Sequence, residues 1–171
     1  HWHDVKAYLK KKYDVVVMLY TTTNSFLKGD APQKDTEALK KHCADIRAAG
    51  GVPMIMMPWA KADKQDMMTQ IADHAIRDAN ANNIMVAPSG LAFAKCLKQY
   101  PEIVLIQKDK NPPTPAGTVL EAAVIYATMF KRSPEGYPYV PIGVGTEVDD
   151  ATVAKLEKVA WETTKAFFQW K

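Results

Sequence analysis

The sequence predicts a three-layer α/β/α sandwich with a mostly parallel sheet. Four short apolar runs predict its strands, at residues 15–19, 52–57, 84–87 and 103–106. These runs lack the polar alternation of half-exposed strands, so we expect strands buried on both faces. Longer segments with apolar residues at helical spacing separate the runs. Such alternation is typical of a parallel sheet covered by helices.

The predicted helices lie at residues 2–12, 35–49, 67–80, 91–100, 118–130 and 149–167. Their ends carry recognisable signals, because Gly-Gly at residues 50–51 stops the second helix, Pro101 stops the fourth, and Asp149 caps the last. The helix over residues 118–130 is almost entirely apolar, which predicts that neighbouring elements cover most of it. Residues 133–145 are rich in Pro, Gly and Tyr and predict an irregular surface segment.

Length and composition fit one soluble globular domain over residues 1–171, with 47% hydrophobic and 24% charged residues. The net charge of +3 is small and the lysines are scattered, so we expect no nucleic-acid partner. No apolar stretch reaches the length of a membrane span, so we expect no membrane insertion. Cys43 and Cys96 have neither metal nor redox spacing and are expected to be buried free thiols.

The loop over residues 109–118 joins the fourth predicted strand to the apolar helix. Pro112, Pro113 and Pro115 stiffen this loop before any ligand binds. Asp109 stands at the carboxyl end of the strand, the edge at which active sites of open α/β sheets usually lie. Two interpretations are open at this point: an acid that orients a neighbouring group, or a solvated carboxylate before a helix-entry turn.

The segment over residues 109–123 resembles a known block, D-x-x-H-P-T-x-x-G-x-x-L-x-A. It is the last block of the SGNH (GDSL-like) hydrolases, and the likeness is strongest to their bacterial, carbohydrate-esterase-like group. Shorter sequence motifs at residues 88–93, 100–103 and 133–136 fall where members of the family have similar motifs. The resemblance therefore runs from Trp2 to about Phe167. It implies the flavodoxin-like arrangement of that family.

In this family a serine of an amino-terminal G-D-S block attacks an ester carbonyl, and the histidine of D-x-x-H takes its proton. The aspartate of the same block orients the histidine. Asp109 matches that aspartate, and Asn24 matches the asparagine that stabilises the oxyanion. Thr23, beside Asn24, is predicted to contact the substrate. The resemblance implies no cofactor and no metal.

Two of the catalytic groups have no counterpart in the sequence. Pro112 occupies the position of the histidine and cannot accept a proton. The G-D-S block and the second-block glycine are absent, since the serines are Ser25, Ser89 and Ser133 and none follows an amino-terminal strand. The resemblance therefore implies a domain without its amino-terminal nucleophile block, and a large loss of hydrolytic rate.

Aromatic residues and histidines suggest further sites. Trp59, Tyr137 and Tyr139 can offer flat apolar surfaces to a sugar ring, or can cover the core instead. His42 and His74 lie in predicted helices, where we expect solvated or hydrogen-bonded side chains rather than a catalytic base.

The segment His1-Trp2-His3 has the spacing of a copper or nickel site made by a terminal amine, backbone amides and imidazole. The same residues resemble part of the family's L-x-x-H-W stretch, so truncation of a longer chain is the alternative explanation.

The resemblance thus implies an SGNH-type ester hydrolase whose parent activity removes carboxylic-ester or O-acetyl groups, such as those on a carbohydrate, and which is weak or inactive in this chain. Two alternatives are a non-catalytic module that binds a glycan or a protein, and metal-dependent activity at His1 and His3. The expected partners are a small ester or acetylated carbohydrate, and a second copy that covers the missing strand. Members of the family are often exported, and this sequence shows no signal peptide.

Overall fold

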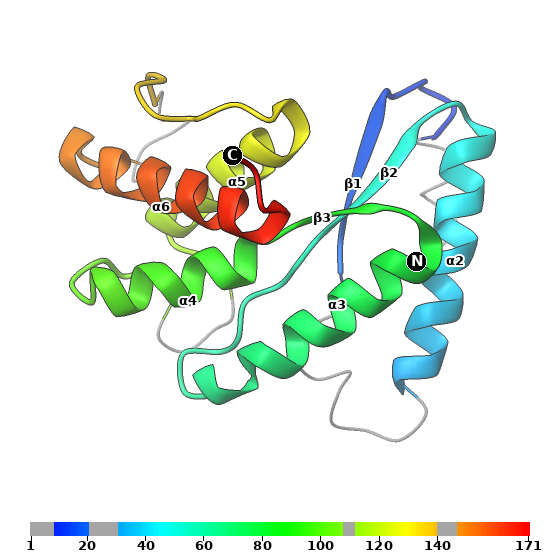
Figure 1. Cartoon of the computed structure of the whole chain (residues 1–171), viewed down its shortest axis with the longest axis horizontal. Helices are drawn as coiled ribbons and strands as arrows, with labels where there is room; N and C mark the ends of the chain where they lie inside the picture. Colours follow the sequence, from blue (N-terminus) through cyan, green and yellow to red (C-terminus); the bar gives the residue numbers. More distant parts are fainter. Residues whose placement is uncertain (1–8, 21–30, 108–111, 140–146) are drawn as a thin grey trace.

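The computed structural model describes residues 9–20, 31–107, 112–139 and 147–171 (Figure 1). Its strands are β1 (Val15–Leu19), β2 (Val52–Met56) and β3 (Met85–Ala87). Its helices are α2 (Ala31–Ala48), α3 (Met68–Asn82), α4 (Ser89–Gln99), α5 (Pro115–Phe130) and α6 (Asp150–Phe168), with a 3₁₀ turn, η2 (Gln65–Met67), before α3. The predicted α/β class is confirmed.

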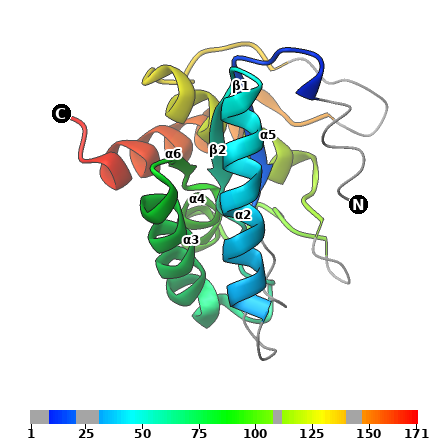
Figure 2. The ribbon, with the colours of Figure 1, turned by 90° about the vertical axis from the view of Figure 1, so that its right-hand side faces the viewer.

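The three strands form one parallel sheet with β2 in the centre, in the order β1-β2-β3. Side chains of β2 alternate between two hydrophobic cores, because successive residues of a strand point to opposite faces. Met54 and Met56 belong to the core shared with α4, α5 and α6, whereas Ile55 belongs to the core shared with α2 and α3. The sheet therefore lies between two helical layers, as Figure 1 shows, and α2 and α3 lie side by side in Figure 2.

Helix ends follow the local signals of the sequence. Asp149 caps α6, since its side chain accepts a hydrogen bond from the Thr152 amide at 2.9 Å. Gly50 follows α2 with a φ of +89°, a conformation that favours glycine. Most predicted boundaries agree within three residues, but α2 begins four residues earlier than residue 35. These predictions of helix type and position are confirmed.

The prediction of a fourth strand at residues 103–106 is wrong for the described part of the chain. Only Ile106 pairs there, in a single antiparallel bridge to Pro113. The carbonyl of Leu105 instead accepts a hydrogen bond from the amide of Thr114 at 2.9 Å. The Leu105 carbonyl and the Gln107 amide therefore bond to this returning segment rather than to β3.

The prediction that β1 is buried on both faces is wrong at two positions. Val17 is 36% exposed and Leu19 is 61% exposed. Both lie on the face of β1 that Val15 shares with the core under α4 to α6. That helical layer covers β2 and β3 but reaches β1 only at Val15.

Both cysteines are buried and free, as predicted. Burial raises the pKa of the Cys96 thiol to about 11, so this residue is a neutral core side chain at physiological pH. None of the helices in the described ranges is long and apolar enough to cross a lipid bilayer. Most of the predicted helix over residues 2–12, and the part of the irregular segment beyond residue 139, lie outside those ranges.

Candidate functional site

The two flanks of the loop that carries Asp109 run side by side in opposite directions. The amide of Gln107 donates to the carbonyl of Pro112 at 3.1 Å, and Ile106 forms its bridge with Pro113. Pro112 therefore contributes its carbonyl to this ladder, where its missing N–H costs nothing. Asp109 itself lies outside the described residues, but the positions before and after its loop are fixed by backbone hydrogen bonds.

Thr114 and Gly117 join this loop to the start of α5. The Thr114 hydroxyl donates to the carbonyl of Val104 at 2.6 Å, and its oxygen accepts from the Gly117 amide at 3.2 Å. Gly117 lies so close to the preceding segment that a Cβ there would come within 2.3 Å of the Leu105 carbonyl oxygen. Thr114 and Gly117 match the threonine and the glycine of the P-T-x-x-G part of the block. Both therefore have structural roles here: Thr114 caps the helix, and Gly117 allows the close approach of the backbone.

The predicted oxyanion and substrate residues, Asn24 and Thr23, lie outside the described residues, as do Ser25 and the segment His1-Trp2-His3. Pro112 is described, and it is exposed. A proline in this place offers no group that can accept a proton from a nucleophile. The described part of the loop therefore supplies a rigid frame without a base.

The two described histidines lie on α2 and α3, the helices on the opposite face of the sheet from α5. His74 lies on α3, with its Nδ1 atom 2.9 Å from Nη2 of Arg77. His42 lies on α2 and borders a hollow of about 260 Å³ beside Tyr20 and Leu39. Burial is the main cause that lowers the pKa of His42, so its imidazole is neutral at neutral pH. Neither histidine lines the cavity next to Pro113 and Thr114 described below.

Trp59 lies in the hydrophobic core rather than on a binding surface. It is 7% exposed, and its ring stacks on Phe93 with centroids 4.3 Å apart and planes 7° apart. The structure favours the alternative that Trp59 covers the core, because little of its ring can reach a sugar. Ser89 is fully buried at the start of α4, so its hydroxyl cannot reach a substrate as a nucleophile.

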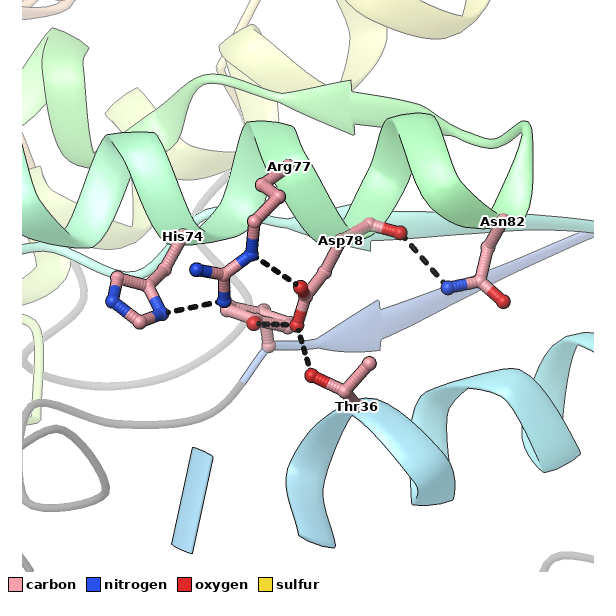
Figure 3. A network of polar contacts seen from close by, with 6 residues as sticks. Thr36, His74, Arg77, Asp78 and Asn82 are labelled. Atoms are coloured by element: carbon pink, nitrogen blue, oxygen red, sulfur yellow. Dashed lines mark hydrogen bonds and ion pairs between the residues drawn. The ribbon is translucent and has the colours of Figure 1, made fainter. Parts of the chain in front are cut away.

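A buried carboxylate on α3 joins three elements at the carboxyl end of β1 (Figure 3). Oδ2 of Asp78 accepts hydrogen bonds from the hydroxyls of Tyr20 at 2.5 Å and Thr36 at 2.8 Å. Oδ1 accepts from Nε of Arg77 at 3.2 Å. These donors occupy most of the carboxylate's acceptor positions, so we assign Asp78 to stability rather than to proton transfer.

A cavity of about 530 Å³ opens where the loop meets α5. The α5 side contributes residues spaced three or four apart, which share one face of a helix. The lining residues are Pro113, Thr114, Pro115, Thr118, Val119, Ala122, Ala123, Tyr126, Pro134, Tyr137, Pro138, Tyr139 and Glu157. This volume suits a small organic ligand, and the lining is mostly apolar.

Glu157 is the acidic group of this cavity. The residue is 7% exposed, and its Oε2 atom accepts a hydrogen bond from the Gly136 amide at 3.0 Å. Burial is the main cause that raises the pKa of Glu157, and the nearby Glu135 adds to it. The pKa of Tyr126 is also raised, chiefly by a hydrogen bond with Tyr137. The cavity therefore combines a desolvated carboxyl group with tyrosine rings.

The sequence patterns predicted a binding role for Tyr137 and Tyr139, but did not single out Glu157 or Tyr126. A signal for Glu157 is present in the sequence. It falls on the apolar stripe of α6 with Val153, Leu156 and Ala160, at helical spacing. An acid on a buried helix face needs a partner or a function, and this alone could have marked Glu157.

Among the described residues, no three His, Cys, Asp or Glu side chains are placed to hold a metal ion. No protein-family profile and no curated protein sequence matches this chain. A solved crystal structure of a DUF4886 family protein from Bacteroides uniformis is similar, with a TM-score of 0.75 and 18% identity. The match covers 98% of this chain and 68% of that protein. This likeness shows the fold.

Proposed function

We propose that this chain carries an SGNH-type hydrolase domain whose parent activity is hydrolysis of carboxylic esters, such as acetyl groups on a carbohydrate. As it stands, the chain hydrolyses esters weakly or not at all. The observation that carries this proposal is the hydrogen-bonded frame formed by the two flanks of the loop that contains Asp109. Hydrogen bonds fix both flanks of the four-residue stretch with Asp109, while Pro112 stands where the base is expected.

The frame suggests an experiment that adds the missing base. Pro112→His replaces an exposed residue that donates no hydrogen bond, so the frame should tolerate it. We expect the parent chain to hydrolyse a chromogenic acetyl ester no faster than a heat-inactivated sample. We expect Pro112→His to raise the rate by about tenfold or more, because a positioned imidazole with an orienting acid is an effective catalyst.

The controls separate a positioned base from a merely added histidine. Pro101→His places an imidazole on another exposed proline and should raise the rate much less. Asp109→Asn in the Pro112→His background should remove most of the gain. Equal rates for the two histidine variants would contradict the proposal, as would a substantial rate of the parent chain that Asp109→Ala leaves unchanged.

The cavity beside α5 favours a second candidate function, which is binding of a small ligand without catalysis. Its volume of about 530 Å³ and mostly apolar lining support this candidate. A neutral apolar probe, 3,3-dimethylbutan-1-ol, should shift the NMR resonances of residues that line the cavity. Ala122→Phe should fill the space next to α5 and abolish these shifts. Shifts of equal size in the parent chain and this variant would contradict binding in the cavity.

A further inference from the structure

We propose that the cavity between α5, α6 and residues 134–139 is a binding site for a small organic cation, namely an alkylated ammonium group on a short apolar body. The inference rests on the second candidate function above and names the class of ligand. Three features carry it: the aromatic walls, the buried carboxyl group, and the scarcity of other polar groups.

The walls are tyrosine rings that meet at an angle. The ring centroids of Tyr126 and Tyr137 are 5.1 Å apart and their planes are tilted by 54°. Tyr139 lines the same cavity. The negative face of an aromatic ring attracts a cation, so several tyrosines around one space favour an alkylated ammonium group over a neutral group of the same shape.

The face of α5 that forms the floor of the cavity carries small side chains next to Tyr126. Ala122 and Ala123 lie one turn before Tyr126, and Thr118 lies one turn before Ala122. Small residues at these positions leave the space that larger ones would fill, so the helix face is hollow beside the ring. Methyl groups on a cation would pack against this apolar floor.

Glu157 supplies the matching charge. Within the described residues, the Gly136 amide is the one hydrogen-bond donor to this carboxyl group, so Oε1 has no partner there. No lysine, arginine or histidine is among the residues that line the cavity. Holding the negative charge at this buried position costs free energy, which is why the pKa of Glu157 is raised. A bound cation would offset that cost.

The polar groups in the cavity are too few for a sugar. A hexose presents several hydroxyl groups that each need a partner when they leave water. The lining offers one carboxyl group, the hydroxyls of Thr114 and Thr118, and tyrosine hydroxyls of which one pair is already hydrogen-bonded. Thr118 is also engaged, since its hydroxyl donates to the Thr114 carbonyl at 3.2 Å. A ligand with one charged centre on an apolar body matches these few polar groups better than a hexose does.

The charge test compares choline with its neutral isostere, 3,3-dimethylbutan-1-ol, by NMR titration of the folded chain. We expect choline to bind at least about fivefold more tightly than the isostere, since cation–π contacts and a buried ion pair are absent for the latter. Glu157→Gln should weaken choline binding by about tenfold and leave binding of the isostere nearly unchanged.

Two further variants complete the test. Glu162→Gln removes an acid from the same helix, but one that pairs with Lys95 at 2.6 Å and does not line the cavity, so both affinities should stay unchanged. Ala122→Phe should abolish binding of both probes, which keeps the test decisive if Glu157→Gln fails to fold. Equal binding of choline and its isostere would overturn the cation assignment and keep the small-ligand function. Absence of binding by either probe would overturn both.

Discussion

Glu157 and Glu162 lie on the same helix, and their pKa values shift in opposite directions. Burial raises the pKa of Glu157, whereas the hydrogen bond from Lys95 lowers the pKa of Glu162. A raised carboxyl pKa means that the folded state binds the proton more tightly than the unfolded state does. The contribution of Glu157 to stability is then fully present below its unfolded pKa and is lost as the pH rises through its folded pKa.

We therefore expect the stability of the parent chain, relative to Glu157→Gln, to fall as the pH rises above the ordinary glutamate pKa of about 4.3. Urea unfolding at a series of pH values measures this difference. Glu162→Gln is the matched control, for which we expect the opposite pH dependence. The free energy of unfolding of the parent chain, relative to this variant, should increase as the pH rises from low values. A pH-independent difference between the parent chain and Glu157→Gln would contradict the buried placement of this carboxyl group.

At the scale of elements, the start of α5 depends on a residue without a side chain. A Cβ at Gly117 would come within 2.3 Å of the Leu105 carbonyl oxygen and within 2.9 Å of the Pro113 side chain. The first contact is with backbone, which cannot swing away. We expect Gly117→Ala to lower the free energy of unfolding by about 1–3 kcal/mol, as overpacking does. Chemical denaturation measures this loss.

Ala122→Ser is the control for Gly117→Ala, because Ala122 is exposed on the same helix. Its effect should stay within about 0.5 kcal/mol, as is usual for surface substitutions. If Gly117→Ala is equally mild, the loop and α5 do not pack as closely as the structure has them.

Helices could be predicted from the sequence because their signals are local. Apolar spacing, the Asp149 cap and the glycine after α2 each act within a few residues, and each is found where the sequence places it. The apolar run at residues 103–106 shows the limit of such signals. Its pattern is that of a buried strand, but a run of apolar residues does not say which backbone it pairs with. The returning residues around Thr114 take up its hydrogen-bonding groups instead.

At the scale of the whole molecule, the cavity could be predicted only in part. The loop residues 113–115 and the tyrosines at 137 and 139 carried signals, and they do lie at one cavity. Glu157 joins them from α6, which is close in space but distant in sequence. Contacts of this kind depend on how helices of one layer pack, and spacing within a single element does not contain that information.

The sheet has an open edge at β1 in the described part of the chain, where β1 pairs with β2 alone. Val17 and Leu19 expose apolar side chains beside that edge, although the run at residues 15–19 has the composition of a strand covered on both faces. An edge that is both unpaired and apolar favours pairing with another chain. We therefore expect the chain to self-associate reversibly, with an apparent mass that rises with concentration in sedimentation velocity.

Leu19→Lys places a charge on this edge and should shift association to concentrations about tenfold higher, because a lysine on an edge strand disfavours edge-to-edge pairing. Val104→Lys is the matched control: Val104 is 59% exposed, close to the 61% of Leu19, but lies on the segment before the loop. If both lysine variants weaken association equally, general surface hydrophobicity drives it. If the parent chain stays monomeric at all concentrations, the edge of β1 has no partner in a second copy. Association that only Leu19→Lys weakens would identify β1 as the contact, since the two variants remove similar apolar surface and differ in the element that loses it.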